Sequence, residues 1–197
     1  MSLRVWLPLD GDLRNLGTSN VEVVNNGATV DNAGKIGKCY SFSGNALYGD
    51  LSTINNMTQA SGCCWVYLTN LNSAQYFFHF GGQSSYPAKF SLDYEGSIRS
   101  QINGIEYISG ITLNTSTWYH VAFTWNGSSI KWYINGEEKV SKTTSGTFSA
   151  SNHFAIGART NGTAGNTFAY SITNGGKIND VRIYDNCLSA AEVKEIS

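Results

Sequence analysis

Residues 118–140 read WYHVAFTWNGSSIKWYINGEEKV, two runs of alternating aromatic and β-branched residues that each end at an Asn-Gly pair. Asn-Gly readily adopts the positive φ angles that a tight hairpin turn needs. The pairs Asn126-Gly127 and Asn135-Gly136 therefore predict antiparallel strands over 118–125 and 130–135. This stretch indicates a β-rich domain.

The rest of the chain repeats this pattern at intervals of roughly ten residues, with Gly, Asn, Asp and Ser between the runs. Further strands are predicted at 3–9, 21–24, 39–42, 46–51, 63–69, 75–80, 89–94, 97–102, 153–157 and 177–184. Loops are expected at 141–152 and 158–176, which are polar and dotted with glycine. Ser189 followed by Glu192 forms a capping box, which predicts a short C-terminal helical turn. The pattern predicts one all-β domain over residues 1–197, an antiparallel two-sheet sandwich.

Composition excludes some kinds of partner. Charged residues make up 14% and the formal net charge is −1, without a basic stripe, so no nucleic-acid binding is expected. No apolar run approaches the roughly 18 residues of a membrane span, so no membrane insertion is expected either. The first twelve residues, MSLRVWLPLDGD, do not read as a signal peptide, which predicts a protein made in the cytoplasm.

The four cysteines are Cys39, Cys63, Cys64 and Cys187. They form no Cys-x-x-Cys pair, so a zinc site is not expected. One interpretation is that these cysteines are reduced thiols in the core. A Cys39–Cys187 bridge in an oxidising environment is the other.

Three more segments add to the hairpin at 118–140. They are GKIGKCYSFSGNALYGDL (34–51), SGCCWVYL (61–68) and INDVRIYDNCLSAAEVKEI (178–196). In this order the four segments resemble the laminin-G-like domains of the concanavalin A-like lectin/glucanase group. The resemblance implies a concanavalin A-like jelly roll, a fold that carries many activities. It therefore leaves the ligand open.

The opening of the chain carries a narrower resemblance. VWLPLDGDLRNLGTSN (5–20), followed by GKIGKCYSF, is similar to laminin-G-like proteins of phages and prophages of gut bacteria. This implies a virion or tail protein, which is assembled inside the host cell and needs no signal peptide.

Catalytic and metal-binding signals are sparse. Glycosidases flank the scissile bond with two carboxylates, and the nearest pair here is Asp93 and Glu95 at a turn. An enzyme is therefore not expected, and a glycan-processing site at this pair is the weakest hypothesis. No cofactor is required. Pairing of the first and last strands could bring Asp10, Asp12 and Asp180 together, so one hypothesis is that they hold a structural calcium. The alternative is that they are ordinary turn carboxylates.

Strand alternation predicts a binding face. If Cys64, Val66 and Leu68 point into the core, their neighbours point outward, and the same reasoning applies to the other strands. The outward residues are Trp65, Tyr67, Asp93, Arg99, Gln101, Trp118, His120, Lys131 and Tyr133. Sugars stack their C–H faces on aromatic rings while their hydroxyls need directional partners, which this mixture offers. The alternative is a second small core, covered by 141–152 or 158–176.

The sequence thus predicts a non-catalytic recognition module for a carbohydrate or cell-surface glycan, displayed on a phage particle. The competing hypothesis is a structural or decoration protein of a virion or fibre. Its partners would be other virion proteins rather than a sugar on a host cell surface.

Overall fold

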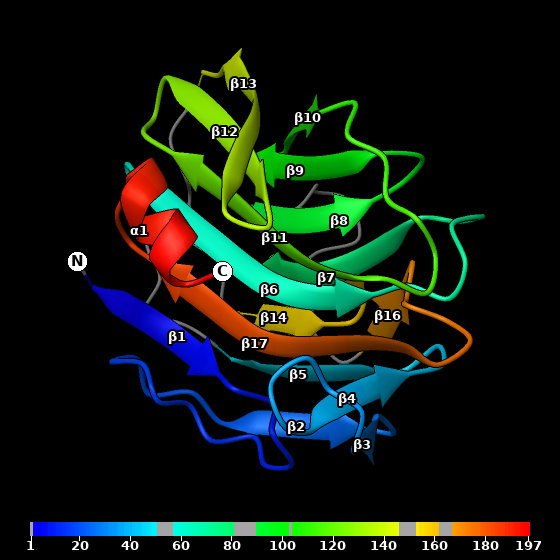
Figure 1. Cartoon of the computed structure of the whole chain (residues 1–197). Helices are drawn as coiled ribbons and strands as arrows, with labels where there is room; N and C mark the ends of the chain where they lie inside the picture. The colour runs from blue at the N-terminus through cyan, green and yellow to red at the C-terminus, as the bar shows by residue number, and fades with distance from the viewer. Residues whose placement is uncertain (1, 51–56, 81–89, 103, 146–152, 162–166) are drawn as a thin grey trace.

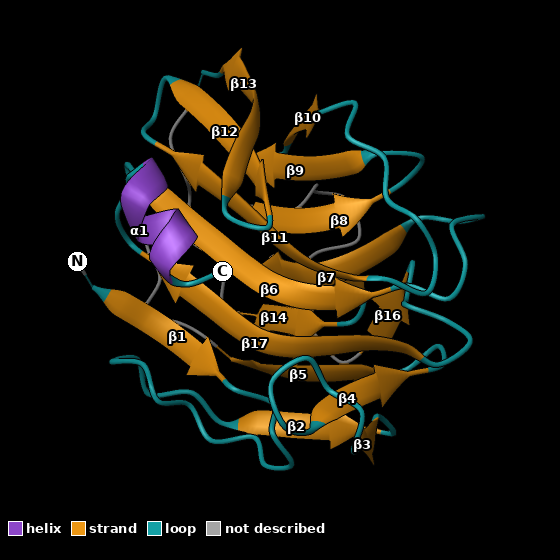
Figure 2. Ribbon diagram, in the orientation of Figure 1, coloured by secondary structure: helices purple, strands orange, loops and turns teal. Residues whose placement is uncertain are grey.

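The computed structural model describes residues 2–50, 57–80, 90–102, 104–145, 153–161 and 167–197. Two antiparallel sheets stack face to face, and one short helix, α1 (Ala190–Glu195), lies on the outside near the C-terminus (Figure 1 and Figure 2). The prediction of an all-β, two-sheet jelly-roll sandwich is confirmed. No helix in the described part is long and apolar enough to cross a lipid bilayer.

Sheet A, in front in Figure 1, contains the hairpin that the sequence predicted. Its strand order is β13 (Glu137–Thr143), β12 (Ser129–Ile134), β11 (Trp118–Trp125), β6 (Ala60–Tyr67), β17 (Gly176–Tyr184), β4 (Cys39–Phe42) and β3 (Thr29–Asp31). The first strand, β1 (Leu3–Leu7), pairs with the C-terminal half of β17.

Sheet B lies behind sheet A. Its strand order is β10 (Ile105–Ile108), β9 (Ile98–Ile102), β8 (Phe90–Tyr94), β7 (Gln75–Phe80), β14 (His153–Ile156), β5 (Ala46–Asp50) and β2 (Val23–Asn26). A separate hairpin of β15 (Arg159–Asn161) and β16 (Thr167–Ala169) follows β14 in the chain.

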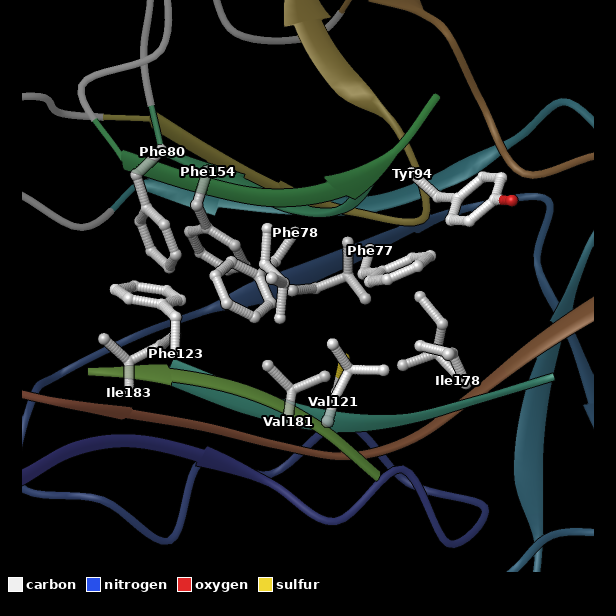
Figure 3. Packing of buried hydrophobic residues seen from close by; sticks show 14 of the residues in the cluster. Phe77, Phe78, Phe80, Tyr94, Val121, Phe123, Phe154, Ile178, Val181 and Ile183 are labelled. Carbon is white, nitrogen blue, oxygen red and sulfur yellow. The ribbon is translucent and has the colours of Figure 1, made fainter. Parts of the chain in front are cut away.

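The core fills the space between the two sheets (Figure 3). Phe78 from sheet B meets Phe123 from sheet A with ring centroids 6.4 Å apart. The predicted inward sets on β6, β11 and β12 are confirmed, because Val66, Phe123 and Trp132 are fully buried in this core. Alternation along β6, β11 and β12 was thus enough to separate core from outer face.

Two of the predicted loops contain strands. In 141–152 the strand β13 continues to Thr143, and 158–176 contains the β15–β16 hairpin. β13 is an exposed edge strand with almost no buried residue, so it lacks the alternating pattern. β15 and β16 have three residues each, too few for a periodic signal. The capping box at Ser189 is confirmed, with reciprocal bonds between Ser189 and Glu192.

The four cysteines are all free thiols. The Cys39–Cys187 bridge is therefore not formed in this structure. Burial raises the pKa of Cys39 to about 11 and that of Cys63 to about 12, which leaves both thiols protonated at neutral pH.

Gly157 lies between β14 and the β15–β16 hairpin, and replacing it with alanine tests how tightly the chain packs there. Its φ is +81°, and an added Cβ would overlap the ring of the fully buried Phe42. We expect Gly157→Ala to lower the free energy of unfolding by about 2 to 3 kcal/mol, from backbone strain plus overpacking. Gly44 is the matched control, because its φ is +89° with nothing within 4 Å of the added Cβ.

Urea denaturation of both variants separates the two contributions. Gly44→Ala should cost about 1 kcal/mol, the backbone strain alone. Equal losses in the two variants would contradict the packing argument at Gly157.

Candidate functional site

The structure divides the nine predicted binding residues between the two sheets. Six lie in β6, β11 and β12 of sheet A, namely Trp65, Tyr67, Trp118, His120, Lys131 and Tyr133. Three lie in β8 and β9 of sheet B, namely Asp93, Arg99 and Gln101. Because both groups point away from the core, they lie on opposite sides of the sandwich. The prediction of one combined face is corrected to two separate faces.

Much of the sheet A group is covered. Tyr133 packs beneath α1, in a small apolar cluster with Leu188 and Val193. The Lys35 ammonium lies 4.6 Å from the centroid of the Trp65 ring, and His120 beside it is completely buried. The alternative of a second small core therefore describes much of this face. The cover that the structure describes is α1 and the segment around Lys35, whereas parts of the predicted covers, residues 146–152 and 162–166, lie outside the described residues.

The sheet B group forms part of a continuous array on the outer face. The pairing of β7 to β10 aligns Tyr76, Asp93, Arg99 and Ile108 in one row across the strands. A neighbouring row contains His79, Ser91, Gln101 and Glu106. A pocket of about 210 Å³ opens over this part of the sheet. Its lining residues are Ala74, Tyr76, Glu95, Arg99, Gln101, Glu106, Arg159 and Tyr170.

An ion network holds Arg99 in this pocket. Its Nε donates to Asp93 Oδ1 at 2.5 Å, and its Nη1 pairs with Glu106 Oε1 at 2.6 Å and also with Glu95. Asp93 is completely buried beneath the guanidinium, and Ser91 Oγ donates to its second oxygen at 3.0 Å. Burial raises the pKa of Asp93 to about 6, although Arg99 and Ser91 act in the opposite direction. Asp93 therefore orients Arg99 rather than facing the pocket.

Two tyrosines complete the wall of the pocket. Gln101 Nε2 donates to the Tyr76 hydroxyl at 3.1 Å, and the Tyr170 ring lies 6.2 Å from the Tyr76 ring. Tyr170 is 51% exposed, and the Arg159 guanidinium lies 4.8 Å from its ring centroid. Tyr170 also has a φ of +53°, which is uncommon outside glycine. The pocket thus offers an exposed aromatic ring beside fixed donors and acceptors.

Sequence reasoning missed five residues of this pocket, namely Ala74, Tyr76, Glu106, Arg159 and Tyr170. Tyr76 lies next to a bulge in β7, which shifts the inward and outward alternation of Gln75–Phe80. Arg159 and Tyr170 belong to a segment that was predicted to be a loop. No local pattern brings that segment to the pocket.

The three aspartates proposed for calcium do not form a metal-binding group. Asp180 accepts from Trp6 Nε1 at 2.7 Å and pairs with Arg182, while Asp12 pairs with Arg14. Asp10 has no role in these contacts. Within the described part of the chain, no group of three or more His, Cys, Asp or Glu side chains is placed to hold a metal ion. The turn carboxylate alternative fits the partly exposed Asp12, whereas Asp180 is buried within β17.

Comparison with known families gives a match over most of the chain. Residues 43–194 match the family model described as the concanavalin A-like lectin/glucanases superfamily. No curated protein sequence matches the chain.

Several solved structures share the fold. Domain 4 of an extracellular arabinanase from Geobacillus stearothermophilus, solved with arabinotriose, has a TM-score of 0.76 and 24% identity, over 99% of this chain and 98% of that one. The ligand binding domain of botulinum neurotoxin serotype D, solved with N-acetylneuraminic acid, has a TM-score of 0.72 and 19% identity. That alignment covers 99% of this chain and 50% of the toxin domain, so the chain spans about half of it. A pentraxin from Limulus polyphemus has a TM-score of 0.61 and 20% identity, over 76% of this chain and 74% of that one.

Proposed function

Since the chain belongs to the concanavalin A-like lectin/glucanases superfamily, we propose that it is a non-catalytic module that binds a glycan. The binding site would be the pocket on the outer face of sheet B. One observation carries the proposal, namely that this pocket combines the exposed Tyr170 ring with a guanidinium and two carboxylates held in fixed positions. The structural neighbours solved with arabinotriose and N-acetylneuraminic acid support the choice of a sugar.

The chemistry of the pocket suits sugar recognition. The Tyr170 ring provides an apolar surface for the C–H face of a sugar, and it is exposed enough to be reached. Glu106 accepts hydrogen bonds and Arg159 donates them, so hydroxyl groups find both kinds of partner. The buried Asp93 keeps Arg99 in place without ligand, which lowers the entropy lost on binding.

The same geometry argues against hydrolysis. A glycosidase needs two carboxylates that flank the scissile bond. Asp93 is completely buried, with its oxygens engaged by Arg99 and Ser91, and Arg99 also pairs with Glu95. The pair Asp93 and Glu95 is therefore bound to one guanidinium rather than placed around a substrate.

The biological setting is a separate part of the proposal. The resemblance of residues 5–20 to phage and prophage proteins supports synthesis in a host cytoplasm and display on a virion. In that setting the ligand would be a glycan of the host cell surface. The alternative, a decoration protein acting through protein contacts, would need no sugar in the pocket.

A glycan array tests the proposal, with Tyr170→Ala beside the unaltered protein. Because Tyr170 is 51% exposed, its removal should leave the fold intact while lowering affinity about tenfold through the lost stacking surface. Tyr67→Ala is the matched control, because it removes an aromatic ring from the opposite face. We expect Tyr67→Ala to bind as the unaltered protein does.

The outcomes of the array distinguish the two faces of the sandwich, and they distinguish glycan binding from the protein-contact alternative. Loss of binding with Tyr67→Ala but not Tyr170→Ala would move the site to sheet A. A folded protein that binds no glycan would overturn the proposal and favour the protein-contact alternative. The array is repeated with a calcium chelator, and we expect binding to persist because the pocket contacts require no metal ion.

A further inference from the structure

A second pocket opens on the outer face of sheet B, over strands β2, β5 and β14. Its volume is about 280 Å³, and its lining residues are Glu22, Val24, Tyr48, Gly49, Asp50 and His153. The strand register pairs Val24 with Tyr48, Tyr48 with Ala155, and Ala155 with His79. This row continues to Gln101 and Glu106 of the first pocket, so the two pockets lie on one face of one sheet.

The β15–β16 hairpin lies between the two pockets. Thr160 Oγ1 is 2.8 Å from His79 Nδ1 on β7, and the Phe168 ring lies 5.4 Å from the Tyr48 ring on β5. Ala155, between these two contacts in the row, is completely buried. The hairpin thus covers the middle of the row, and it contributes Arg159 to the first pocket. Its Phe168 packs against Tyr48, which lines the second pocket.

The second pocket carries an excess of negative charge, whereas the charged side chains that line the first pocket balance. In the first pocket, Arg99 and Arg159 face the carboxylates of Glu95 and Glu106, with Asp93 buried beneath Arg99. The second pocket has two carboxylates, on Glu22 and Asp50, and no Lys or Arg among its lining residues. A carboxylated or sulfated sugar would meet like charge at the second pocket, whereas neutral hydroxyls can donate to the carboxylates there.

We propose that the second pocket is a further sugar-binding subsite, and that the face as a whole takes a neutral oligosaccharide that occupies both pockets. This inference rests on the proposed function. From β9 to β5 there are four strand spacings, which is about 19 Å. The ligand must therefore be longer than a disaccharide and must pass the β15–β16 hairpin. The second pocket rejects acidic sugars by charge.

The test uses an array of neutral arabinan, xylan, mannan, galactan and glucan oligosaccharides of two to eight sugars, with sialylated and sulfated oligosaccharides beside them. The variant is Asp50→Ala/His153→Ala, which removes two polar groups from the second pocket. The matched control is Glu137→Ala, which removes an exposed carboxylate from the edge of sheet A. We expect the double variant to bind the longest neutral chains about tenfold more weakly and the disaccharides unchanged.

The outcomes separate the inference from the proposed function. If the double variant binds every chain length as the control does, the second subsite is wrong while the first pocket stands. Preferential binding of sialylated or sulfated sugars would overturn the charge argument alone. If no glycan binds at all, the proposed function fails, and if Tyr170→Ala has no effect, the proposed site in the first pocket fails. In either case the second subsite fails with it.

Discussion

Arg99→Met is expected to lower the free energy of unfolding by about 3 to 5 kcal/mol at neutral pH, because it leaves a buried carboxylate without its counter-charge. Asp93 is completely buried, and Arg99 Nε is its charged partner at 2.5 Å. Methionine fills a similar volume but donates no hydrogen bond. The loss should be smaller at about pH 5, where Asp93, whose pKa is already raised to about 6, binds a proton.

Urea denaturation at both pH values measures this effect. Arg14→Met is the matched control, because it breaks the exposed Arg14–Asp12 ion pair and should leave stability nearly unchanged. The double variant Arg99→Met/Asp93→Leu should recover part of the loss, since no charge is then left buried. If Arg99→Met were no more destabilising than Arg14→Met, the buried pair would not have the role assigned to it here.

Acidification from about pH 7.5 to about pH 4.5 is expected to lower the free energy of unfolding by about 3 kcal/mol in total, mainly because two histidines are buried. Burial lowers the pKa of His79 to about 3 and that of His120 to about 4, with Arg159 and Arg182 adding to the respective shifts. In the unfolded chain a histidine binds a proton below about pH 6.5, whereas the folded protein keeps both rings neutral. Each ring therefore loses about 2 to 3 kcal/mol of stabilisation over this range.

Asp93 acts in the opposite direction. Its folded pKa of about 6 lies above the unfolded value near 3.8, so the folded state binds the proton first as the pH falls. This offsets about 2 kcal/mol of the loss between pH 7.5 and pH 4.5, and the net value already includes it. Urea denaturation across this pH range measures the sum.

Substituting each histidine in turn shows how much of the pH dependence of stability comes from each ring. His120→Gln and His79→Gln should each flatten the fall in stability on acidification, because glutamine binds no proton. His153→Gln is the control, since its ring is only partly buried. A protein whose stability rises steadily from pH 7.5 to pH 4.5 would contradict the prediction that both buried rings stay neutral.

The hairpin at 118–135 and the inward residues of the long strands could be predicted from sequence. Both depend on local chemistry, the Asn-Gly turn and the alternation of side chains along a strand. The capping box at Ser189 is local as well. The charged site at Arg99 could be predicted only in part, because Asp93 and Arg99 were assigned to the outward face without the contact between them.

Alternation determines which residues of one strand share a face, but not which sheet that strand joins. The sequence by itself therefore determined the fold class, the core residues and the separate outward sets, including Trp65 with Tyr67 and Arg99 with Gln101. Only the tertiary structure decided that these sets lie on opposite sides of the sandwich, since sheet membership depends on pairing between distant strands. It also brought Arg159 and Tyr170 to the pocket and placed α1 over sheet A. Those contacts join segments whose own sequence carries no periodic signal, so only packing against the finished sheets positions them.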